Sequence, residues 1–200
     1  MLGEVGDVPV RVVGRARSAG KTLIAPLSDR PCVAFRLRIT ETRGRQFGRT
    51  VLDLRGGVPF LLADESGVAL IEAEDTRRMA LVPDLTGTIG GYRQVRPEAE
   101  AGLHVFSLLE AHGTNTETWL GFERRYSFEE GILGADGQVA VGGVAAREPY
   151  PDGERPTTRM FPERLVFRDT PGCRLSISTF SRALGGLVGG ADAQRTARGL

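Results

Sequence analysis

The most constraining feature of this sequence is an alternation of apolar and polar residues with a period of two. Within residues 32–42 (CVAFRLRITET), the apolar side chains are Val33, Phe35, Leu37 and Ile39. Arg36 and Arg38 lie between them. Because successive side chains of a strand point to opposite faces, this run predicts a half-buried strand with one apolar face and one basic face.

Shorter runs rich in apolar residues recur along the chain, separated by turn residues. They cover Val8–Ala16, Thr22–Pro26, Val51–Leu54, Phe60–Ala63, Val68–Ala73, Trp119–Ser127, Gln138–Ala145, Arg164–Arg168 and Arg174–Thr179. Turns rich in Gly and Asp at residues 64–67, 134–137 and 169–172 predict three hairpins. Many short strands joined by such turns predict a mainly β fold, either an antiparallel sandwich or a partly open barrel.

Two segments are expected to be helical. Residues 98–112 follow Pro97, carry acidic side chains in their first turn and end before Gly113, which predicts one inserted helix. A short C-terminal helix is predicted to follow Ser181 and to run to residue 188.

The 200-residue length suits a single domain, expected over residues 1–188. Residues 189–200 contain too little apolar surface to pack and are expected to form a flexible tail. Residues 148–156 (EPYPDGERP) are expected to form a proline-rich surface loop.

Composition narrows the possible function. The 26 basic and 25 acidic residues give a net charge of +1, which argues against binding to nucleic acid or anionic lipid through the whole surface. Two cysteines and two histidines cannot supply a cysteine-rich zinc site, so no metal and no cofactor are expected. The chain begins without the pattern of a signal peptide and contains no long apolar run, so a cytoplasmic location is expected.

No arrangement of residues in the sequence predicts an enzyme. Cys32 directly follows Pro31 at the start of the alternating run and is interpreted as a buried structural thiol. A catalytic pairing of Cys32 with a histidine in space, acting on a small ligand, remains the enzymatic alternative. His104 and His112 lie two turns apart on the predicted helix, which favours a surface helix over a metal site. The adjacent acids Glu129 and Glu130 are interpreted as a solvated turn.

The strongest candidate site is the arginine-rich stretch over residues 36–55. The candidate binding residues are Arg36, Arg38, Arg43, Arg45 and Arg49. A basic face of this kind would dock an acidic partner protein or, alternatively, an anionic membrane surface. Phe47 is the single aromatic residue in the loop, which argues against a nucleic-acid reader. A structural alternative is that these arginines pair with acidic side chains of the next strand.

Several motifs occur in an order that resembles the GIDE/MAPL-type domain, also called the BAM ("beside a membrane") domain. They are Gly14-x-Ala16 with residues 23–28 (LIAPLS), residues 31–36 (PCVAFR), residues 59–69 (PFLLADESGVA), residues 126–133 (YSFEEGIL) with the glycines of 137–143, and residues 175–184. This domain occurs in membrane-anchored E3 ubiquitin and SUMO ligases and in bacterial relatives. The resemblance implies a domain that recognises other proteins.

The departures from that family limit what the resemblance implies. Family members usually carry flanking transmembrane helices, and the ligases carry a RING, which needs eight Cys/His ligands for its two zinc ions. This sequence has only Cys32, Cys173, His104 and His112. The expected function is therefore that of a non-catalytic protein-recognition module, associated with a membrane only through its partner.

Overall fold

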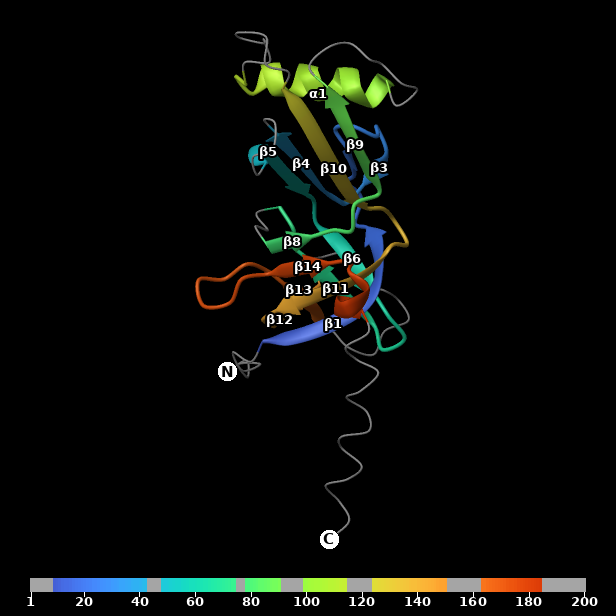
Figure 1. Ribbon diagram of the computed structural model, residues 1–200. Helices are drawn as coiled ribbons and strands as arrows, with labels where there is room; N and C mark the ends of the chain where they lie inside the picture. The colour runs from blue at the N-terminus through green and yellow to red at the C-terminus, as the bar shows by residue number, and fades with distance from the viewer. Residues whose placement is uncertain are drawn as a thin grey trace.

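The computed structural model describes residues 9–42, 48–74, 78–90, 99–114, 124–150 and 163–184. Within these ranges the chain is mainly β, with its strands in three sheets and with two helices. Figure 1 shows a four-stranded sheet above an eight-stranded sheet, with the helix α1 (Ala99–Ala111) lying across the top. This arrangement confirms the prediction of a mainly β fold with one inserted helix.

The larger sheet contains eight strands. In spatial order they are β12 (Ala145–Pro149), β13 (Glu163–Phe167), β7 (Val68–Ile71), β6 (Phe60–Ala63), β1 (Val10–Ser18), β11 (Gln138–Gly143), β14 (Ser176–Ser178) and β8 (Arg78–Ala80). Most neighbours are antiparallel, but β13 pairs with β7 and β14 with β8 in parallel. Since β12 and β8 remain at opposite ends of this order, the sheet is not a closed barrel.

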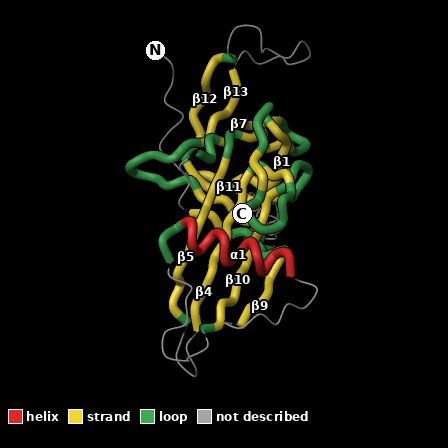
Figure 2. Tube along the Cα trace, turned by 90° about the horizontal axis from the view of Figure 1, so that it is seen from above, coloured by secondary structure: helices red, strands yellow, loops and turns green. Residues whose placement is uncertain are grey.

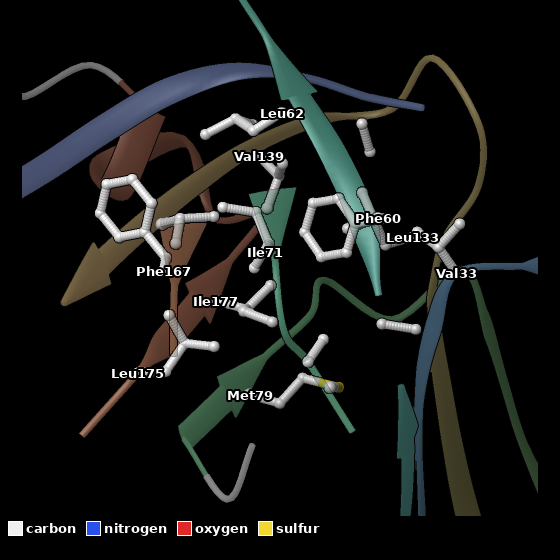
Figure 3. Packing of buried hydrophobic residues seen from close by; sticks show 14 of the residues in the cluster. Val33, Phe60, Leu62, Ile71, Met79, Leu133, Val139, Phe167, Leu175 and Ile177 are labelled. Carbon is white, nitrogen blue, oxygen red and sulfur yellow. The ribbon is translucent and has the colours of Figure 1, made fainter. Parts of the chain in front are cut away.

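The eight-stranded sheet curls around its own core. Only Val144 separates β11 from β12, although β12 lies at the far end of the strand order, so the sheet bends back on itself. Figure 3 shows the side chains that meet inside, among them Phe60, Leu62, Ile71, Val139, Phe167, Leu175 and Ile177. Burying each large apolar side chain stabilises the fold by about 1.5–3 kcal/mol.

The smaller sheet consists of β5 (Arg49–Gly57), β4 (Ala34–Thr42), β10 (Arg125–Leu133) and β9 (Leu85–Gly90), in that order. Helix α1 packs on one side of it, which we call the inner face, and Figure 2 shows the helix crossing over β4 and β10. The buried contacts of this layer include Leu37, Ile39, Val105, Leu109, Tyr126 and Phe128. The opposite side is the outer face, and α1 leaves it uncovered. The short strands β2 (Leu23–Ile24) and β3 (Pro31–Cys32) pair with each other.

One of the three predicted hairpins is confirmed. Strands β6 and β7 pair in antiparallel fashion over four consecutive positions. The turn between them is held by Asp64, whose Oδ1 accepts hydrogen bonds from the backbone N–H groups of Ser66 at 2.7 Å and Gly67 at 2.9 Å. An aspartate that binds the backbone two residues ahead is a common means of reversing the chain.

The other two predicted hairpins are wrong. The chain does turn at residues 134–137 and 169–172, but the strands on either side pair with other partners. Strand β10 lies in the four-stranded sheet and β11 in the eight-stranded one. Strand β13 pairs with β12 and β7, whereas β14 pairs with β11 and β8. Turn residues predict where a chain reverses direction. Which strands then pair depends on how each whole strand is buried in the fold.

Three element assignments also need correction or restriction. Glu148 and Pro149, expected in a surface loop, belong to the edge strand β12, where proline is tolerated. Strand β10 continues through residues 129–130, where a solvated turn was expected. The predicted C-terminal helix begins as expected, as α2 (Ser181–Leu184). Its continuation to residue 188, the expected tail 189–200 and loop residues 151–156 lie outside the described residues.

Candidate functional site

The outer face of the four-stranded sheet carries a cluster of basic side chains. On β4, Leu37 and Ile39 are buried beneath α1, so the alternating residues Arg36 and Arg38 project from the outer face, as predicted. In the antiparallel register, Arg55 of β5 lies opposite Arg36, and Asp53 lies opposite Arg38. We call these three arginines around Asp53 the arginine cluster.

Asp53 is the centre of this cluster. Its Oδ1 accepts hydrogen bonds from Nε of Arg36 and Nε of Arg55, each at 3.2 Å. Its Oδ2 accepts from Nη2 of Arg36 at 2.9 Å and from Nη2 of Arg55 at 3.0 Å. Paired guanidinium–carboxylate hydrogen bonds of this kind are among the strongest in proteins. The expected pairing of an arginine with an acid of the next strand is thus observed.

The surrounding arginines change the acidity of Asp53. Partial burial alone would raise the pKa of this carboxyl, but hydrogen bonds from Arg36 and Arg55 and their positive charges lower it far below its ordinary value of 3.8. The same hydrogen bonding raises the pKa of Arg55. The Asp53 carboxyl is therefore ionised at neutral pH. Glu129 of β10, opposite Arg38 in the register, adds a second acid to this face.

The arginines differ in how firmly they are held. Arg36 also donates from Nη1 to the carbonyl oxygen of Met79 at 3.3 Å, so it links the four-stranded sheet to β8 of the larger sheet. Arg38 approaches Asp53 only at 3.8 Å, which is an ion-pair distance beyond hydrogen-bonding range, and 41% of its side chain is exposed. Arg38 is therefore the member of the cluster best able to reach an external acidic group.

The remaining candidate arginines do not join the cluster. Arg49 is exposed at the start of β5, opposite Glu41, and six residues of extended strand place it about 20 Å from Arg55. Arg43 and Arg45 lie outside the described residues. Arg55 and Asp53 were not among the predicted site residues, and the signal that would have added them is the pairing register of β4 with β5.

Several other side chains on the outer face are polar. Thr86 and Thr88 of β9 and Glu129 of β10 are exposed, while Thr40 and Ser127 are half-buried. The face ends near Arg36, where the segment after β8 crosses β10. A Cβ atom at Gly131 would lie 2.7 Å from the carbonyl oxygen of Val82. The cluster therefore sits where a hydroxyl-rich sheet face meets the larger sheet.

On the inner face, β10 carries a buried carboxylate. Glu130 is 1% exposed, and its two oxygens accept hydrogen bonds from the backbone N–H groups of Leu27 at 2.7 Å and Ser28 at 3.0 Å. The interpretation of Glu129 and Glu130 as a solvated turn is therefore wrong, because both lie in β10 and only Glu129 is exposed. This carboxylate fixes the loop between β2 and β3 against the sheet, and the same loop places Asp29 at 4.0 Å from Nδ1 of His104 on α1.

Cys32 lies in an apolar environment close to this carboxylate. It is 1% exposed and packs with Ala25 and Ile132. Burial raises the pKa of its thiol to about 11, and the negative charge of Glu130 adds to the effect. Because the thiolate is the nucleophilic form of cysteine, this environment opposes nucleophilic chemistry at neutral pH. His104 on α1 and His112, directly after the end of α1, are both exposed, as expected for a surface helix.

A hollow of about 300 Å³ opens at one end of the eight-stranded sheet. Its lining includes the apolar side chains of Leu62, Leu165 and Phe167 and the charged side chains of Arg147 and Glu163. Neither Cys32 nor the arginine cluster lines this hollow.

Among the described residues, no three or more histidine, cysteine or acidic side chains gather in a way that could hold a metal ion. Neither described helix combines the length and the apolar character needed to cross a membrane.

Comparisons with known proteins found no relative of this chain. No protein-family model matches the chain, and neither a similar curated protein nor a similar solved structure was found. The resemblance to the GIDE/MAPL-type domain therefore remains a prediction from sequence motifs.

Proposed function

We propose that this chain is a non-catalytic protein-recognition module that binds an acidic segment of a partner protein through the arginine cluster on its outer face. The observation that carries the proposal is the state of Arg38, whose side chain is 41% exposed and whose guanidinium lies 3.8 Å from Asp53, beyond hydrogen-bonding range. Arginine suits this role because its planar guanidinium binds carboxylates in pairs of parallel hydrogen bonds.

Two further observations support the proposal. Among the elements that the structure describes, α1 covers only the inner face, so the outer face is the side of the sheet on which a partner is expected. The burial and raised pKa of Cys32 speak for a role without nucleophilic catalysis. The resemblance to the GIDE/MAPL-type domain, whose implied task is protein recognition, agrees with this proposal, and the expected cytoplasmic location is part of it.

Binding of a fluorescently labelled oligoglutamate peptide, followed by fluorescence anisotropy, tests the proposal. We expect Arg38→Glu to weaken binding by about three- to tenfold, because it replaces attraction by repulsion at an exposed site. Arg17→Glu is the matched control, since Arg17 is an exposed arginine of β1 in the other sheet. Its effect should be much smaller, and raising the salt concentration should weaken the binding of the unmodified chain.

Equal losses in Arg38→Glu and Arg17→Glu would show that the peptide responds to overall charge, which contradicts recognition by the cluster. A parallel titration with vesicles containing phosphatidylserine separates the membrane alternative. Stronger binding to these vesicles than to the peptide, with the same dependence on Arg38, would replace the partner protein by an anionic membrane surface.

A further inference from the structure

Within the part of the chain that the structure describes, the edge strand β9 lacks the protection that the other sheet edges carry. Exposed edges present unpaired backbone groups, and proteins usually guard them with charges, proline, bulges or very short strands. Strand β9 has the sequence LTGTIG over six residues, without charge or proline, and pairs with β10 in unbroken register. Among the described residues, nothing pairs with its other side.

Each of the other three edges of the two larger sheets carries at least one such guard. Strand β8 has only three residues, and the guanidinium of Arg36 binds the carbonyl of Met79. Strand β12 carries Arg147 and ends at Pro149, and its Glu148 pairs with Arg168. Strand β5 carries charged side chains and has a register shift against β4. The contrast indicates that β9 is an edge kept available for pairing.

We propose that β9 pairs with β9 of a second copy of this chain, forming a two-fold symmetric dimer with a continuous eight-stranded sheet across the interface. The strand is complementary to itself. With Gly87 on the two-fold axis, Thr86 faces Thr88 of the other copy on the outer face, and Leu85 faces Ile89 on the inner face. Threonine pairs and aliphatic pairs opposite each other both stabilise antiparallel sheets.

Charge also favours a second copy as the occupant. An uncharged strand meets no like charge when it faces its own image, and the net charge of +1 gives the two chains little mutual repulsion. Gly87 leaves room for the ring of Phe128, which a Cβ at this position would meet at 2.3 Å. Isologous pairing of this type is the commonest symmetry of soluble homo-oligomers.

The dimer would have a consequence for the outer face. A two-fold axis perpendicular to the sheet keeps the faces of both copies aligned, so the two arginine clusters would lie on the same side. The inference does not depend on the proposed function, because dimerisation is measured without any acidic peptide. A dimer that binds no peptide would leave the pairing intact and contradict only the recognition proposal.

Sedimentation equilibrium of the full chain over a range of concentrations tests the inference. We expect a species of about twice the 21.6 kDa of one chain. Thr86→Lys/Thr88→Lys places lysines opposite each other in two symmetric pairs and should weaken dimerisation by about tenfold or more. Thr50→Lys is the matched control, because Thr50 is an exposed threonine on the opposite edge strand of the same sheet.

A mixing experiment makes the test specific. The variant Thr86→Glu/Thr88→Glu should also be monomeric when it is measured by itself. An equimolar mixture of the glutamate and lysine variants should form a dimer again, because opposite charges then face each other. A chain that stays monomeric at every concentration would overturn the inference. So would a dimer that Thr86→Lys/Thr88→Lys leaves intact, or two folded variants whose mixture remains monomeric.

Discussion

At the scale of single residues, Asp53 determines how three arginines share one surface. Its carboxylate accepts hydrogen bonds from both Arg36 and Arg55, which lie opposite each other on neighbouring strands and carry like charges. The alternation of β4 predicted that Arg36 and Arg38 share a face. The central role of Asp53 could not be predicted, because it depends on the register between β4 and β5, which shifts between Ile39 and Thr40.

Replacing Asp53 by asparagine should destabilise the fold in a pH-dependent manner. The pKa of Asp53 is lower in the folded chain than its ordinary value of 3.8, so its contribution to stability is fully present above that value and is lost as the pH falls further. We expect Asp53→Asn to lower the free energy of unfolding by about 1–2 kcal/mol at neutral pH, measured by urea denaturation. The loss should shrink below pH 3.8.

Glu129→Gln is the control for this measurement, because Glu129 is an exposed acid on the same face, opposite Arg38 in the register. Its effect should stay within about 0.5 kcal/mol. An Asp53→Asn effect that does not change with pH would contradict the assigned role of the carboxylate.

The two cysteines should differ in reactivity toward a thiol reagent. Cys32 is buried with a pKa near 11, whereas Cys173 is partly exposed. In the native chain, we expect Cys173 to be labelled well before Cys32, with both labelled at similar rates in denaturant. Mass spectrometry of the labelled peptides identifies the site. Rapid labelling of native Cys32 at neutral pH would instead support the enzymatic alternative.

At the scale of elements, strand β10 anchors a distant loop on the inner face of the small sheet. Its Glu130 holds the loop between β2 and β3, and that loop delivers Leu27 to the core beneath α1. The helix and the hairpin of β6 and β7 could be predicted because their signals are local. The burial of Glu130 could not, since its backbone donors lie more than 100 positions away along the chain.

Substituting Glu130 by glutamine should therefore release this loop. The glutamine amide keeps one acceptor oxygen but turns an N–H₂ group toward a backbone N–H, leaving a buried donor unpaired. We expect Glu130→Gln to cost about 2–3 kcal/mol of unfolding free energy. Hydrogen exchange at the amides of Leu27 and Ser28 should accelerate. If Glu130→Gln proved as mild as the adjacent Glu129→Gln, the carboxylate would not be what holds the loop.

At the scale of the whole molecule, the two sheets are interleaved along the chain. Strand β1 belongs to the larger sheet, β4 and β5 to the smaller, β6 to β8 again to the larger, β9 and β10 to the smaller, and β11 to β14 to the larger. Composition and turn spacing predicted a mainly β fold, but they did not predict that the chain passes back and forth between two sheets. The apolar and polar residues of a short strand form too short a pattern to specify which other strand it will pair with.

This interleaving affects how the protein can be made. Val10 pairs with Gly143, and β11 in turn pairs with β14 near residue 177. During synthesis, one edge of β1 can pair with β6 early, but its other edge must wait for β11, which is made much later. Pairings of such long sequence separation are slow to form, so the nascent chain passes through a prolonged stage with unpaired strand edges. One edge of β1 therefore stays open for longer than it would in a chain of locally paired hairpins, which lengthens the stage at which chaperones can protect the nascent chain.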